Sequence, residues 1–260
     1  YRLYKRGSLL YSVFEIGAYT IPAREFFINC GTVVGLIVLF STICKTVHID
    51  KIKIIVVYSL SLLFSILGSK FAGALLEWDM QSSLLDTLRN SEAVNFSGYV
   101  LFFTILFSVL YKLILKNYNG FSQNIKASAL YMAIQHMFNR IGCLMAGCCG
   151  GREYRGFLAL HYSPNDTGYY PVQPFEIISM ILVLFFVVFL YDSKKINVFC
   201  LFIIWFGITF FIGDIFRDNL YDLRILGLTI SQMISCILVV TGGIMNFKFC
   251  GVNKWRNLKI

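Results

Sequence analysis

The stretch Ile225–Phe247 reads ILGLTISQMISCILVVTGGIMNF and carries no charged residue over 23 positions. A helix that crosses a membrane needs about 20 largely apolar residues, so this stretch predicts one. Six further stretches of similar character precede it. We therefore expect one transmembrane domain over residues 1–260, all-α, with seven spans at about 26–44, 54–76, 93–111, 127–149, 174–191, 196–213 and 225–247.

The composition of the 260 residues agrees with this expectation. Hydrophobic residues make up 57% of the chain and charged residues only 14%. Soluble domains usually have about 45–50% apolar and about 25% charged residues. A soluble chain of this size has too little interior for so many apolar side chains. The composition excludes a disordered protein, a disulfide scaffold and an ordinary cytosolic enzyme, and it indicates a polytopic membrane protein.

Charges in the connections between spans predict the orientation. One set of connections holds twelve basic residues against only Asp50 and Asp192, and the other set holds mainly acidic residues. Basic loops stay in the cytoplasm, so we expect the N-terminus outside and the C-terminus inside. The net charge of +9 then reflects topology, and it indicates no nucleic-acid partner. We interpret Leu9–Ala23 as an interfacial helix or a short re-entrant segment, and we expect an outer arm between the fourth and fifth spans.

The arginines are distributed differently from the lysines. Only Arg256 among ten arginines falls on the predicted cytoplasmic side. Arginine forms forked contacts with phosphate and keeps its charge when partly buried. One interpretation is interfacial anchoring, and the other is an outward-facing site for anionic lipid head groups.

The fourth span carries the densest group of candidate site residues. His136 and Arg140 are four residues apart and share one helix face, and Cys143 continues the same stripe. The span ends in a glycine-rich run that we do not expect to be regular helix. Irregular backbone at membrane depth is tolerated where it is buried in protein or lines a cavity. A small-residue packing face is the alternative, but it does not account for His136 and Arg140.

Two other spans place charges at the same predicted boundary. Asp214 and Arg217 close the sixth span, either as a simple ion pair three residues apart or as part of the same cavity. Glu176 opens the fifth span after Gln173, either as a carboxylate favoured by the helix dipole or as a site residue.

The eight cysteines do not predict a metal site. Most of them lie within spans and are expected to act as small apolar residues. The adjacent Cys148 and Cys149 raise redox chemistry or metal binding as an alternative. Neighbouring cysteines form strained disulfides, and no Cys-x-x-Cys or paired Cys/His spacing accompanies them.

The run from His136 to Gly151 contains Arg140-Ile-Gly-Cys143 and Ala146-Gly147-Cys148-Cys149. This pattern resembles the prolipoprotein diacylglyceryl transferase family, in the branch whose signature reads RIGCxxAGCCxG. Other motifs fall in matching order over nearly the whole chain. Pro171–Glu176 resembles P-T-Q-L-Y-E, Phe206–Arg217 resembles Y-G-x-x-R-F-x-x-E-F-x-R, Leu228–Gln232 resembles L-S-x-S-Q, and Ile16–Ile21 resembles a strand-like lead-in to the first span.

The resemblance implies a seven-helix protein of a bacterial-type plasma membrane, with its site facing the outer leaflet. It implies a transferase that moves the diacylglyceryl group of phosphatidylglycerol to a lipobox cysteine thiol of a prolipoprotein, without a cofactor. His136 would be the base and Arg140 would bind the phosphate. The substrate site would be completed by Cys143, Gly147, Gly151, Arg152, Gln173, Glu176, Asp214 and Arg217.

The chain departs from the family pattern at several positions. Arg24-Glu25 replaces a Tyr-Gly pair, Ser97-Gly98-Tyr99 lacks a usual catalytic histidine, Cys143 replaces asparagine, Phe210 replaces arginine, and Asp214 replaces glutamate. These departures leave three hypotheses open. The protein is a prolipoprotein transferase, a transferase with a changed acceptor or donor, or a lipid- or peptide-binding protein that has lost catalysis. A transporter is disfavoured because the spans lack two halves with paired broken helices.

Overall fold

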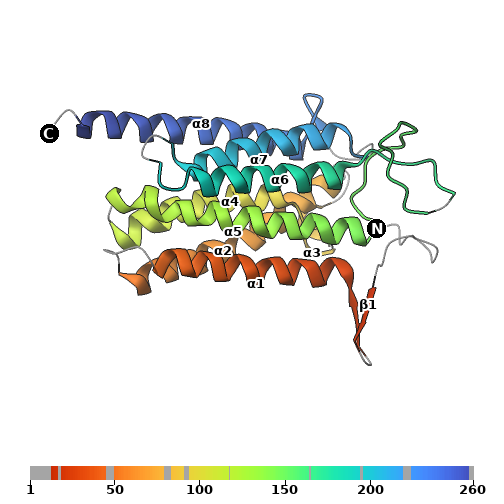
Figure 1. Ribbon diagram of the computed structural model, residues 1–260, viewed down its shortest axis with the longest axis horizontal. Coiled ribbons are helices and arrows are strands. Elements are labelled where there is room, and N and C mark those ends of the chain that lie inside the picture. The colour runs from red at the N-terminus through yellow and green to blue at the C-terminus, as the bar shows by residue number, and fades with distance from the viewer. Residues whose placement is uncertain are drawn as a thin grey trace.

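The computed structural model describes residues 13–16, 19–44, 50–78, 83–90, 94–116, 118–163, 165–193, 196–218 and 224–257, and Figure 1 shows them as a bundle of roughly parallel and antiparallel helices. The helices are α1 (Ala23–Cys44), α2 (Lys51–Glu77), α3 (Leu84–Asn90), α4 (Phe96–Leu110) continued by a π-helical turn η1 (Tyr111–Leu115), α5 (Tyr118–Met145), α6 (Val172–Phe189), α7 (Val198–Ile215) and α8 (Ile230–Asn257).

Six of these helices are long and apolar enough to cross a membrane. They are α1, α2, α4 together with η1, α6, α7 and α8. Many large apolar side chains on them are exposed, among them Leu63 at 59% and Phe185 at 63%. Exposed apolar surface of this extent suits contact with lipid. The prediction of an all-α, multi-pass membrane protein is confirmed.

The predicted fourth span corresponds to α5, which differs in character from those six. Its 28 residues extend about 42 Å, which is long enough to cross a bilayer. It contacts α1, α6 and α7, and its polar residues Asn124, Ser128 and His136 are buried. A helix enclosed by other helices can carry polar side chains because protein surrounds them. The assignment of α5 as a further span, which would bring the total to seven, stays a prediction, and so does the N-out orientation.

The N-terminal segment corrects one interpretation. We predicted an interfacial helix or re-entrant piece over Leu9–Ala23, but β1 (Val13–Ile16) and β2 (Tyr19–Pro22) form an antiparallel hairpin, and Ala23 already belongs to α1. Residues 9–12 and 17–18 lie outside the described part of the chain. The two strands are rich in β-branched and aromatic residues, which favour an extended backbone.

The seventh predicted span begins later than the apolar composition suggests. β3 (Arg224–Ile225) and β4 (Leu228–Thr229) form a hairpin, and the two residues between them, Leu226 and Gly227, have φ of 55° and 80°. Two consecutive positive φ values are typical of a tight two-residue hairpin loop.

A capping box then starts α8 at Ile230. The backbone N–H of Gln232 donates to Thr229 Oγ1, and the backbone N–H of Thr229 donates to Gln232 Oε1, both at 3.1 Å.

Glycines hold α1 close to α5. A Cβ atom added at Gly31 would lie 2.5 Å from Phe138 Cβ, and one added at Gly35 would lie 2.9 Å from Tyr131 Cδ2. These two glycines, four residues apart, form a small-residue face of the kind that lets membrane helices approach closely. The contact fixes α5, which carries the candidate site residues.

The two ends of the bundle are chemically different. The hairpins and the arm between α5 and α6 gather at one end, opposite the C-terminus (Figure 1). At the other end, Lys126 Nζ donates to the carbonyl oxygens of Tyr191 and Ser193 at 3.0 and 3.3 Å, just beyond α6. The end with the arm is where the candidate site residues meet.

Candidate functional site

A buried carboxylate with two guanidinium partners forms the centre of the site. Glu176, in the first turns of α6, is fully buried and forms ion pairs with Arg140 of α5 and Arg217 just after α7. Arg140 Nε pairs with one carboxylate oxygen and Arg217 Nη2 with the other. One negative and two positive charges leave a surplus of one positive charge among these three side chains. The arrangement is suited to an anionic ligand.

Phe210 lies against both arginines. The guanidinium carbons of Arg140 and Arg217 lie 5.3 and 4.8 Å from the centroid of its ring, within the range of cation–π contacts. The Arg217 Nε atom is buried and has no hydrogen-bond partner among the described residues. This N–H group is a donor that a bound anion would satisfy.

His136 lies behind the ion pairs. Its side chain is fully buried, with Nε2 3.9 Å from Glu176 Oε2. The rings of Phe96, Phe206 and Phe210 surround it, with centroids 4.5, 5.2 and 5.5 Å away. Neither ring nitrogen forms a hydrogen bond within the described part of the chain. The structure therefore brings His136 to the site but separates it from solvent.

Asp214 and Arg217 turn toward different partners. Arg217 pairs with Glu176, while Asp214 Oδ2 accepts a hydrogen bond of 2.6 Å from the hydroxyl of Thr229, the cap of α8. Of the two interpretations of Arg217, the arrangement favours the one in which it joins the cluster. Asp214 links the end of α7 to the start of α8.

Gln173 links the end of α5 to the outer arm. It is fully buried, its Nε2 donates to the carbonyl oxygen of Cys148 at 2.7 Å, and the hydroxyl of Tyr162 donates to its Oε1 at 2.9 Å. Gln173 thus holds backbone next to the cluster in place.

Gly151 and Arg152 attach the arm to the end of α7. Gly151 and Arg217 form an isolated antiparallel β-bridge between their backbones. The backbone N–H of Arg152 donates to the carbonyl oxygen of Phe216 at 2.9 Å. A Cβ atom at Gly151 would lie 2.5 Å from the carbonyl oxygen of Tyr170, so the backbones approach too closely for a side chain. The exposed Arg152 side chain lies over the ring of Tyr170 at 5.5 Å.

The end of α5 brings three thiols together. The predicted span ran to Cys149 with a glycine-rich end that was not expected to be regular helix, and α5 indeed ends at Met145, with a positive φ of 64° at Gly147. The N–H of Cys148 bonds to the carbonyl of Cys143, and the N–H of Gly147 bonds to that of Leu144. These two bonds define a Schellman motif, in which the residue after the glycine contacts the third residue from the helix end. The Sγ atoms of Cys143, Cys148 and Cys149 lie within 4.8 Å of one another.

This cluster was not predicted from the sequence, because the adjacent Cys148 and Cys149 were interpreted without Cys143. The signal that predicts the contact is Gly147, whose place after an apolar helix favours the left-handed turn.

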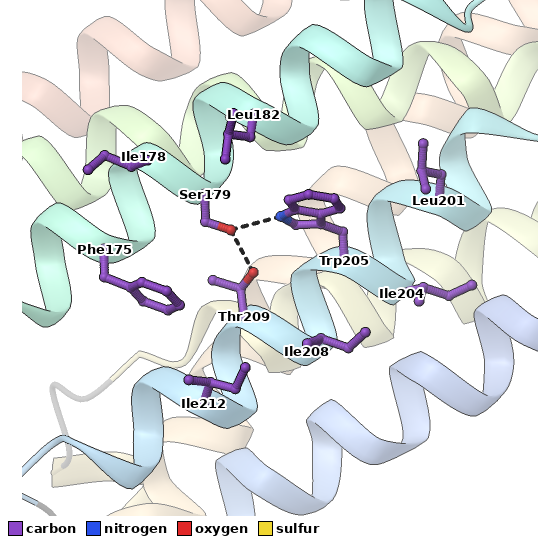
Figure 2. Close-up of a pocket in the computed structure, with 10 residues that line it drawn as sticks. All are labelled: Phe175, Ile178, Ser179, Leu182, Leu201, Ile204, Trp205, Ile208, Thr209 and Ile212. Carbon is purple, nitrogen blue, oxygen red and sulfur yellow. Dashed lines mark hydrogen bonds between the residues drawn. The ribbon is translucent and has the colours of Figure 1, made fainter.

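An apolar groove, which the sequence analysis also missed, runs between α6 and α7 (Figure 2). Its volume is about 370 Å³. Its polar atoms are paired with one another, because Trp205 Nε1 donates to Ser179 Oγ at 2.8 Å and the hydroxyls of Ser179 and Thr209 lie 2.7 Å apart. The remaining walls are apolar, and Phe175 and Ile212 line the end near Glu176 (Figure 2).

Comparison with models of known protein families identifies one that fits the chain. The family model for prolipoprotein diacylglyceryl transferase matches residues 12–248, which is most of the chain. No curated protein matches the sequence.

Proposed function

The chain belongs to the prolipoprotein diacylglyceryl transferase family, a family of membrane transferases, and from this premise we propose that it transfers the diacylglyceryl group of phosphatidylglycerol to a cysteine thiol. The acceptor is a cysteine-containing precursor peptide or prolipoprotein. The reaction takes place at the outer leaflet of a bacterial plasma membrane, at the end of the bundle that carries the arm.

The observation that carries this proposal is the buried cluster of Glu176, Arg140 and Arg217. Its surplus positive charge suits the phosphate of a phospholipid, and so does the Nε of Arg217, which has no hydrogen-bond partner in the described part of the chain. Phosphate is also where negative charge develops when the bond to the glyceryl carbon breaks. Arginines held in place beforehand stabilise that charge in a site that excludes bulk water.

The groove between α6 and α7 supports a lipid as the donor. The groove and the cluster share helices, since Phe175 lines the groove and the adjacent Glu176 faces the arginines. Several groove residues are exposed on the outside of the bundle, among them Ile178 at 58%. In this arrangement the head group lies at the arginines and one acyl chain lies in the groove.

The proposed reaction forms one bond and breaks one. The sulfur of the acceptor attacks the glyceryl carbon, a C–S bond forms, and the C–O bond to phosphate breaks with its electron pair leaving on glycerol phosphate. The proton of the thiol passes to a base, for which we propose His136. Because Glu176 Oε2 lies 3.9 Å from His136 Nε2, the carboxylate is the route by which the proton reaches the enclosed ring. Gly147, Gly151, Arg152, Gln173 and Asp214 position the elements that hold the cluster.

The direct test is incubation of membranes containing the protein with labelled phosphatidylglycerol and a lipobox peptide. We expect label to move to the peptide, and to remain in the lipid when the peptide cysteine is replaced by serine. Absence of labelled peptide, in an assay where a known enzyme of the family works, contradicts transfer to a lipobox thiol.

His136→Gln tests the assignment of the base. The amide keeps the size and polarity of the ring but does not take up a proton, so transfer should be lost while lipid binding is retained. His161→Gln is the matched control because His161 lies on the arm with its side chain 51% exposed. Full transfer activity in His136→Gln would remove His136 from the mechanism.

A second candidate function is lipid binding without transfer. Phe210 packs against both arginines at a position where the family pattern has arginine, and aromatic rings enclose His136. The same labelled lipid distinguishes the two candidates. Tight binding that Arg140 variants abolish, with no transfer to any thiol peptide, would favour this second function.

A further inference from the structure

The three thiols at the end of α5 come from two separate backbone features. The Schellman motif accounts for the contact between Cys143 and Cys148. It does not account for Cys149, which reaches the other two through a positive φ of 57°. A positive φ is uncommon for a residue other than glycine. Such conformations cluster at ligand-binding sites, where the surrounding structure maintains them.

The spacing of the thiols suits a metal ion. In a tetrahedral zinc site the Zn–S distance of about 2.3 Å places sulfurs about 3.8 Å apart. The three Sγ atoms already lie within 4.8 Å of one another, so small side-chain rotations bring them to this spacing. The exposure of Cys149 gives an ion access to the cluster, while Cys143 is buried.

Charge near the cluster favours thiolates and limits the kind of ion. Arg140 Nη1 lies 4.0 Å from Cys143 Sγ, and the Arg140, Arg217 and Glu176 side chains together carry one surplus positive charge. Three thiolates and a divalent ion together carry only one negative charge. A monovalent ion would leave two negative charges.

We propose that Cys143, Cys148 and Cys149 bind one thiophilic divalent metal ion, with Zn²⁺ as the ion that best fits the ligand set and the charge. The described residues supply three protein ligands, which leaves the fourth tetrahedral position for a further ligand such as water or a thiol. The proposal does not depend on the transfer reaction proposed above.

The test measures metal in the full-length protein, purified in detergent without chelators. We expect about one zinc ion per chain by elemental analysis, and thiolate-to-metal charge-transfer absorption after Co²⁺ replaces zinc. Cys143→Ser and Cys149→Ser should each lose the bound metal and the absorption. Cys236→Ser should keep both, because Cys236 is exposed on α8 and belongs to no such cluster among the described residues.

Two results would overturn the metal site, and neither requires any variant to fold. One is wild-type protein that contains no zinc, takes up no Co²⁺ and shows all three thiols free to alkylation. The other is mass-spectrometric detection of a disulfide between two of the three cysteines in protein purified without oxidant. Both results are independent of lipid transfer, so they leave the proposed function untouched.

Discussion

The side chain of Glu176 is completely enclosed, and each of its carboxylate oxygens pairs with an arginine. Breaking a buried ion pair by removing one partner typically costs about 3–5 kcal/mol, since it leaves an uncompensated charge. The helices that carry Glu176, Arg140 and Arg217 are therefore held at this point by electrostatics as well as by packing. The same residues are the ones proposed to bind the lipid phosphate.

Arg140→Lys tests the head-group site at the level of one side chain. Lysine keeps the positive charge but lacks the planar guanidinium group of arginine. In Arg140 this group pairs with Glu176 through Nε and leaves its other nitrogens available to a ligand. We expect transfer to fall by roughly 10²-fold and lipid affinity to fall with it, as measured with labelled phosphatidylglycerol.

The control for this variant is Arg155→Lys, since Arg155 is exposed on the arm. Unchanged affinity and turnover in Arg140→Lys would exclude Arg140 from the site.

At the scale of the element, the ends of helices place the site. Gly147 lies just after α5, and its left-handed backbone directs Cys148 and Cys149 back toward the helix. Thr229 and Gln232 form the capping box that starts α8. Thr229 also donates to Asp214, so the same cap joins α8 to α7. The cluster of Glu176, Arg140 and Arg217 lies where four helices begin or end. Small shifts of these helix ends therefore alter its geometry.

Gly213→Ala tests how closely α6 and α7 must approach. A Cβ at Gly213 would lie 2.9 Å from Glu176 Oε1, the oxygen that pairs with Arg217. We expect a loss of stability of about 1–3 kcal/mol from overpacking, together with weaker lipid binding. Thermal unfolding in detergent and lipid titration measure the two effects. Gly243→Ala is the matched control, because nothing lies within 4 Å of its added Cβ. Equal behaviour of the two variants would contradict the close contact.

Asp166 gives the outer arm a predicted dependence on pH. Burial opposes ionisation, but backbone hydrogen bonds from Ser163, Tyr162 and Gly168 and a contact with His161 lower the pKa of Asp166. A lowered pKa contributes stability above the unfolded value of about 3.9, which is lost as the pH falls through the folded pKa. Protection of the amides in this arm, taken relative to their intrinsic exchange rates, should therefore fall below about pH 4.

The variant Asp166→Asn provides the reference for this prediction. Its arm should exchange quickly at every pH, because the amide lacks the charge that the backbone N–H groups stabilise. If the amides of the arm exchange at the same rate in the wild type and in Asp166→Asn near neutral pH, then Asp166 does not stabilise the arm.

At the scale of the molecule, the arm lies at one end of the bundle and the C-terminus at the other (Figure 1). The arginine cluster lies at the end with the arm, and Lys126 lies at the other end. Thiol labelling tests the predicted orientation. Cys149 and Cys44 are both exposed, and α1 places Cys44 at the end opposite the arm. In variants in which Cys149 or Cys44 is the one remaining cysteine, so that no thiol cluster is left to bind metal, a membrane-impermeant maleimide added to intact spheroplasts should label Cys149 and spare Cys44.

Opening the membranes should make Cys44 reactive, which confirms that the thiol itself is accessible. The reverse pattern, with Cys44 labelled from outside, would invert the topology and place the site at the cytoplasmic face. In that case the distribution of lysines would have predicted the wrong orientation, but the assignment of the helices would be unaffected.

The sequence alone determined the class of the protein and most of its helices. An uncharged apolar run such as Ile225–Phe247 has no stable alternative to the membrane, and spacing along one helix places Arg140 beside His136 and Cys143. The family pattern also pointed to Glu176 and Arg217, because their motifs occur in the expected order. The first two inferences need only local periodicity, charge and composition, whereas the assignment of Glu176 and Arg217 is what the family resemblance implies.

Only the tertiary structure decided which of those residues meet. Glu176 had two interpretations until α5 and α7 brought a guanidinium to each carboxylate oxygen, and the groove beside Trp205 exists only where α6 and α7 lie together. The hairpins before α1 and α8 and the thiol cluster depend on turns with positive φ or on strand pairing. Apolar composition specifies that a segment is buried in lipid or protein, but contacts between distant segments specify its partners.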